Sequence, residues 1–334
     1  MTATMDALVV RAAGLSAHLL DPAGRAALLR AVDFATIARE LGTRGYAVAD
    51  PRPDAPALEL AIRRGAGARL RQLARWEPGE ALGRLLFALE DQRSLRGLLR
   101  GAAAGVPAEA RLLGLLPTPT LPERVQAELA RLPSVAAIAA LLAAWRSPFA
   151  PALRPARAGH PDLLSIDVAL ARTAGAMALA AACQLGGGWR GFVREAIDLD
   201  NLRTALLLVG RGGDLLPASL FLPGGEALTL EGCTRIAAAA PDQVAALLPR
   251  VLAATTLAPL LPPEIGDPAT LERDLADRRR QAWQRRARRD PLGAAPVVSY
   301  LLSLRAEVVF LQRAVWGVAL GAPPPRRDHA AGPP

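Results

Sequence analysis

Apolar residues recur at helical spacing along most of the chain. The clearest stretch lies in the middle, where the steps between apolar positions are three or four residues: Phe192, Ala196, Leu199, Leu202 and Leu206. Such steps place side chains on one face of a helix. The same spacing predicts helices over most of the sequence, interrupted by Pro- and Gly-rich breaks. Aromatic residues make up only 4% of the chain, and no convincing strand pattern appears, so the expected fold class is all-α.

A polar stripe accompanies this central apolar stripe. Arg194, Asp198 and Asn201 stand at helical spacing, and Asp200 lies one turn before Arg203. We therefore expect carboxylates and arginines to pair along the helix, each pair adding a few tenths of a kcal/mol.

The carboxylate of this stretch has two counterparts elsewhere in the chain. Asp91, Asp198 and Glu307 each precede a leucine by four residues, and they are 107 (198 − 91) and 109 (307 − 198) residues apart. Arg96 of the first copy corresponds to Arg203. The three copies predict an internal triplication.

A second feature repeats with a similar period. Three helical patterns end shortly before a large apolar residue, at Tyr46, Phe149 and Leu257, which are 103 and 108 residues apart. A period near one hundred is too long for a solenoid repeat and predicts tandem domains of one architecture. We expect helical units at 1–116, 117–221 and 222–320, followed by a disordered tail at 321–334. Three similar units can form a pseudo-threefold ring or funnel.

The net charge of +9 raises an anionic partner as a possibility. All forty basic residues are arginine, which also fits a compositional bias. The absence of lysine excludes a P-loop lysine, a Schiff-base lysine and a kinase-type lysine. The densest basic patch consists of Arg278, Arg279, Arg280, Arg285, Arg286, Arg288 and Arg289. It can be a solvated helix face or a docking surface for an acidic protein, phosphate or lipid.

Motifs for chemistry are weak. The glycine run at 186–191 matches a dinucleotide fingerprint only on paper, because a helical pattern precedes it, so we expect a helix-helix turn there. Cys183 and Cys233 are expected to be buried free thiols, and the scattered histidines predict no metal site. Because Asp91, Asp198, Asp200 and Glu307 stand near arginines on their own helices, we expect structural or interface carboxylates without the raised pKa of a general acid. No cofactor is expected.

Taken together, the residues resemble the C subunit of prokaryotic V/A-type rotary ATPases (ATP synthases), the family that includes the d subunit of eukaryotic V-ATPases. The resemblance is carried by the phrase at 197–203 around Asp198, Asn201 and Arg203, by the segment Leu41-Gly-Thr-Arg-Gly-Tyr46, by Leu222-Pro-Gly-Gly225, and by the helix from Tyr300 to Glu307. In the first copy the asparagine is replaced by Ser94, and in the third it is replaced by Phe310 and the arginine by Gln312.

The resemblance implies a funnel of three helical domains around a pseudo-threefold axis. It also implies a non-catalytic subunit on the cytoplasmic face of the bacterial inner membrane, which links the central shaft to the proteolipid rotor ring and so couples ATP hydrolysis or synthesis to proton or sodium transport. No nucleic acid or small-molecule substrate is expected. The alternative is a stand-alone helical adaptor whose arginine surface binds nucleic acid or anionic lipid.

Overall fold

The computed structural model describes residues 2–75, 79–157, 162–210, 217–265 and 268–322. All regular structure in these ranges is helical, which confirms the all-α prediction. The elements are α1 (Thr2–Ser16), α2 (Pro22–Leu29), α3 (Phe34–Thr43), α4 (Ala55–Ala74), α5 (Gly79–Ala103), α6 (Ala108–Arg111), α7 (Glu123–Arg131), α8 (Val135–Ala144), η1 (Ala150–Leu153), α9 (Arg154–Arg157), α10 (Leu163–Leu185), α11 (Gly187–Leu208), α12 (Pro217–Leu220), α13 (Leu230–Ala237), η2 (Pro241–Gln243), α14 (Val244–Leu252), η3 (Ala258–Leu260), α15 (Pro268–Arg289) and α16 (Ala295–Ala319).

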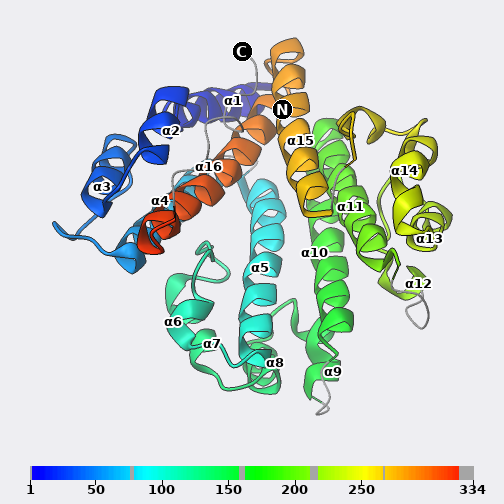
Figure 1. Cartoon of the computed structure of the whole chain (residues 1–334), viewed down its shortest axis with the longest axis horizontal. Coiled ribbons are helices and arrows are strands. Elements are labelled where there is room, and N and C mark those ends of the chain that lie inside the picture. The colour runs from blue at the N-terminus through cyan, green and yellow to red at the C-terminus, as the bar shows by residue number, and fades with distance from the viewer. Residues whose placement is uncertain (1, 76–78, 158–161, 211–216, 266–267, 323–334) are drawn as a thin grey trace.

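The long helices contact one another in a closed cycle. Helix α5 packs against α4 and α10, α11 packs against α10 and α15, and α16 packs against α15 and α4. Figure 1 shows these helices in the middle of the molecule, with the short helices α1–α3, α6–α9 and α12–α14 in three groups around them. The last helix thus lies against the first part of the chain.

Local sequence signals set many helix ends. Asp21 accepts a hydrogen bond from the Gly24 N–H, and Pro22 occupies the first turn of α2, as expected for an N-cap followed by proline. Gly186 joins α10 to α11 with a φ of 99°, a conformation that glycine adopts without strain. The predicted helix-helix turn is confirmed.

One sequence signal for a helix start does not form a cap. Thr120 and Glu123 have capping-box spacing, yet the residue before α7 is Pro122 and makes no side-chain cap. Thr120 instead donates to the carboxylate of Asp91. The pair Asp267-Pro268 is typical of an N-cap followed by the first helical residue, but Asp267 lies outside the described residues, as does the predicted tail from 323 onward.

The buried apolar side chains form three clusters. The largest combines residues of α1–α5, α10–α12, α15 and α16. The second extends from Leu95 to Ala174 and the third from Leu202 to Leu275. Tyr46, Phe149 and Leu257, the large apolar residues of the second repeated feature, are all buried, one in each cluster. The sequence repeat therefore has a counterpart in packing.

Two helices in the described ranges, α10 and α16, are long and apolar enough to cross a membrane by length and composition alone. Both pack against several other helices, and their apolar residues contribute to the clusters described above. Their composition is accounted for by their place in the protein core.

Candidate functional site

Asp198 on α11 holds the loop that leads to α13. Its side chain is fully buried and accepts hydrogen bonds from the backbone N–H groups of Glu226, Ala227 and Leu228, at 2.9, 2.8 and 3.1 Å. Both carboxylate oxygens are used. Because Gly225 in this loop has no Cβ, the chain can lie directly on the carboxylate: an added Cβ would come within 2.0 Å of Asp198 Oδ1. Gly225 thus leaves the space that the Asp198 carboxylate occupies.

Asp91 plays the corresponding part on α5. It is also buried, and the hydroxyl groups of Thr118 and Thr120 donate to its two oxygens, the first at 2.5 Å. These threonines belong to the loop that leads to α7. Burial raises the pKa of Asp91 to about 6, against the opposing effect of the two hydroxyl donors.

Glu307 on α16 is the third copy. It is fully buried and receives a hydrogen bond from the Leu20 backbone N–H in the loop that leads to α2. The Tyr46 hydroxyl donates to it at 2.7 Å, and Arg69 forms an ion pair with it at 2.9 Å. Burial, together with the Glu307 charge, raises the pKa of Tyr46.

The three repeated carboxylates therefore have one role: each holds the loop that follows the first short helix of a group, before α2, α7 or α13. The expectation that they pair with arginines of their own helix is wrong. Arg194 pairs with Glu226 at 3.1 Å and Arg203 with Glu272 at 3.0 Å. The expectation that none of the four motif carboxylates has a raised pKa is wrong for Asp91 and for Asp200. Sequence spacing identified the positions, but the donors come from distant loops.

Asn201 supports Asp198 by holding the same loop. Its amide nitrogen donates to the Leu222 carbonyl at 2.9 Å, and its amide oxygen accepts from the Leu222 N–H at 2.8 Å. In the first copy, Ser94 is too short for this contact, and its buried hydroxyl has no hydrogen-bond partner among the described residues. There Gln126 donates to the Leu116 carbonyl instead. In the third copy, Phe310 lies under Arg25.

The motif arginines join pairs of long helices. Arg96 on α5 forms an ion pair with Asp167 on α10 at 3.3 Å, and Arg203 on α11 forms one with Glu272 on α15. Gln312, which replaces arginine on α16, donates to Glu59 on α4 at 2.9 Å. Each copy of the motif thus fastens one long helix to another.

Asp200 occupies a different position from Asp198. The residue is exposed to water. The protein around its carboxyl group nevertheless raises the pKa by desolvation, and the positive charges of four arginines oppose this effect: Arg93, Arg203, Arg279 and Arg96. These residues come from α5, α11 and α15. The three helices therefore share a polar surface rich in arginine.

Glu195, which the sequence analysis missed, is the hub of a buried network. It accepts from Arg279 at 2.7 Å, from the Trp283 indole N–H at 2.7 Å, and from Arg286 at 3.1 Å. Arg279 also lies over the Phe192 ring. The corresponding positions of the other two copies are Ala88 and Leu304. Because neither is a carboxylate, the repeat gave no signal for Glu195.

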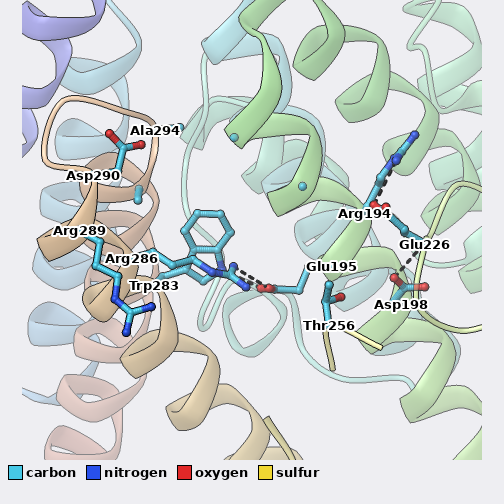
Figure 2. A pocket seen from close by; sticks show the side chains of 13 residues that line it. Arg194, Glu195, Asp198, Glu226, Thr256, Trp283, Arg286, Arg289, Asp290 and Ala294 are labelled. Carbon is cyan, nitrogen blue, oxygen red and sulfur yellow. Dashed lines mark hydrogen bonds and ion pairs between the residues drawn. The ribbon is translucent and has the colours of Figure 1, made fainter. Parts of the chain in front are cut away.

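A cavity of about 410 Å³ lies beside this network. Figure 2 shows Glu195, Arg286 and Trp283 on one side and Arg194, Glu226 and Asp198 on the other. Glu195, Asp198 and Glu226 on this lining already have partners. Since these three carboxylates are engaged with cations or backbone N–H groups, none of the three is placed to move a proton. Among the described residues, no group of three His, Cys, Asp or Glu side chains could hold a metal ion.

The basic patch divides into paired and free arginines. Arg279 and Arg286 bind Glu195, and Arg280 pairs with Asp277 at 3.2 Å. The remaining members, Arg278, Arg285, Arg288 and Arg289, have no ion-pair partner within the described ranges.

One cysteine prediction is wrong. Both thiols are free, but Cys183 is exposed, whereas Cys233 is buried. Burial raises the pKa of Cys233 to about 11.

The described residues thus form an all-helical scaffold in which buried carboxylates fasten loops to long helices. The family model for the ATP synthase (C/AC39) subunit matches residues 8–327. The chain belongs to that family.

Among curated proteins, the chain is similar to the C subunit of the V-type ATP synthase from two strains of Thermus thermophilus. In each case it is 34% identical over 174 residues, which cover 51% of this chain and 52% of the relative. The chain spans about half the length of the curated relatives it matches.

Proposed function

We propose that this chain is a non-catalytic coupling subunit of a V/A-type rotary ATPase or ATP synthase. In this role it links the central shaft to the membrane rotor ring, so that ATP hydrolysis or synthesis is coupled to proton or sodium transport. The support is the family membership over residues 8–327, together with the three loop-holding carboxylates. The family membership does not favour the stand-alone adaptor.

The architecture that accompanies this proposal is a funnel of three related helical units, assigned by sequence to 1–116, 117–221 and 222–320. The closed cycle of long helices and the three outer groups of short helices are consistent with it (Figure 1). In the proposed arrangement, the last long helix of one unit completes the packing of the next. Glu307 on α16, which holds Leu20 at the other end of the chain, is the contact that supports this reading best.

A socket that transmits rotation needs stiffness. Helices fastened by buried carboxylates, as at Asp198, transmit a displacement to their loops because breaking several hydrogen bonds in a dry environment is costly. We place the subunit on the cytoplasmic face of the inner membrane, as a peripheral component. The polar surface around Asp200, formed by α5, α11 and α15, is proposed as one contact with the shaft.

The test is co-purification. The affinity-tagged full-length chain should recover shaft subunits and the proteolipid ring from native membranes in mild detergent, and recovery of neither would overturn the proposal. Arg93→Gln with Arg203→Gln should reduce recovery of the shaft while leaving the ring. The matched control, Arg131→Gln with Arg250→Gln, removes two exposed arginines on the short helices α7 and α14 and should change neither.

A further inference from the structure

The turn between α15 and α16 combines free positive charge with an exposed apolar side chain. Arg285, Arg288 and Arg289 are exposed, and none has an ion-pair or hydrogen-bond partner among the described residues. Leu292, three residues after the helix ends, is 62% exposed. This contrasts with Arg279 of the same helix, whose charge is matched by Glu195.

The start of α11 lies against this turn. A Cβ added at Gly188 would meet the Ala294 Cβ at 2.9 Å, so the two segments touch. Arg190, on the first turns of α11, is exposed and also has no ion-pair partner within the described ranges. We call Arg190, Arg285, Arg288, Arg289 and Leu292 the turn patch.

Two helix N-termini add to the positive potential here. Neither α11 nor α16 has a side-chain cap at its start, so their first N–H groups carry partial positive charge toward this region. The one acidic residue of the turn, Asp290, is folded back: its Oδ2 lies 1.9 Å from where a Cβ of Gly293 would stand.

We propose that the turn patch binds the surface of a bilayer that contains anionic phospholipid, with its arginines on the phosphate groups and Leu292 in the interfacial layer. Arginine binds phosphate through its planar fork, and basic residues beside an exposed apolar side chain are typical of segments that bind at a membrane interface. A nucleic acid would use the charge but would give Leu292 no apolar environment. The inference rests on the proposed function only in that a rotary ATPase subunit works next to a membrane.

The experiment is flotation of the full-length chain with vesicles of phosphatidylcholine, or of phosphatidylcholine mixed with phosphatidylglycerol. Binding is expected only to the mixed vesicles, and it should weaken as salt is raised. Each arginine near an anionic surface contributes about fivefold in affinity, so Arg285→Gln/Arg288→Gln/Arg289→Gln should lower affinity by about a hundredfold. The control triple, Arg131→Gln/Arg235→Gln/Arg250→Gln, removes the same charge from exposed positions on α7, α13 and α14 and should have little effect.

A second pair of variants tests the apolar contact. Leu292→Ser should weaken vesicle binding, whereas Val32→Ser, at a position that is 80% exposed and away from the turn, should not. Equal losses from both triples would overturn the proposal, as would absence of binding to mixed vesicles or equally tight, salt-sensitive binding of duplex DNA. A chain that recovers shaft and ring but ignores vesicles would refute this inference alone.

Discussion

Asp198 provides the sharpest test of the idea that the repeated carboxylates hold loops. In Asp198→Asn the side chain keeps its shape but exchanges one acceptor oxygen for an NH₂ group. Since the two oxygens serve three backbone N–H groups, at least one buried donor loses its acceptor, at about 1–3 kcal/mol. The remaining bonds lose their charge assistance, which adds about 1 kcal/mol. We expect a loss of about 2–4 kcal/mol in the free energy of unfolding.

Urea denaturation at neutral pH measures the total loss, and amide hydrogen exchange at 226–228 locates it. These amides should exchange faster in the variant than in the parent chain. Asp200→Asn is the matched control, because Asp200 lies on the same helix and is exposed. If both variants lose the same stability, or if exchange at 226–228 is unchanged in Asp198→Asn, the loop-holding role of Asp198 is refuted.

Three further predictions concern individual groups. The pKa of Asp91 is raised to about 6 in the folded chain, against 3.8 ordinarily, so the folded state binds the proton of this carboxyl more tightly. The free energy of unfolding should therefore fall by about 3 kcal/mol as pH rises from about 4 to 6. Urea denaturation of Asp91→Asn over the same pH range should lack this loss. Glu195→Gln leaves two arginines without their buried charge partner and should cost about 3–5 kcal/mol, seen as a lower midpoint of thermal unfolding. In the native chain a maleimide should label Cys183 and spare Cys233, which should react only after unfolding; rapid labelling of both would contradict the burial of Cys233.

Helix boundaries were the most predictable part of the fold, because their causes are local. The break at Gly186 and the start of α2 at Asp21 and Pro22 follow from backbone and capping preferences that a few residues contain. Thr120 shows where such local preferences stop deciding the structure, because its capping-box spacing forms no cap. Its capping-box spacing is as good as that of a true cap, but a buried carboxylate on α5 competes for the same hydroxyl. A buried acceptor without partners is costly, so the tertiary contact prevails over the local one.

The positions of the carboxylates in the candidate site were predictable from the sequence, but their hydrogen-bond donors were not. Spacing identified Asp91, Asp198 and Glu307, because the three stretches lie at nearly equal distances along the chain. Their donors differ in kind, from threonine hydroxyls to backbone N–H groups to an arginine, so nothing in the repeated phrase indicated them. The acidic partners of Arg96, Arg203 and Gln312 also repeat along the chain. These partners, Glu59, Asp167 and Glu272, are 108 (167 − 59) and 105 (272 − 167) residues apart, so their spacing could have identified them.

The difference between the three carboxylates follows from chain connectivity. Asp91 and Asp198 hold loops that lie 27 to 30 residues further along the same chain, so the peptide itself keeps each loop near its helix and little closure entropy is at stake. Glu307 holds Leu20, which is 287 residues away, and no short connection restrains that pair. This is also the copy with the strongest set of donors, an arginine and a tyrosine hydroxyl in addition to the backbone. The larger set of donors to Glu307 offsets the lack of a short connection. This contact joins the last long helix to the first helices and so keeps the cycle of long helices closed.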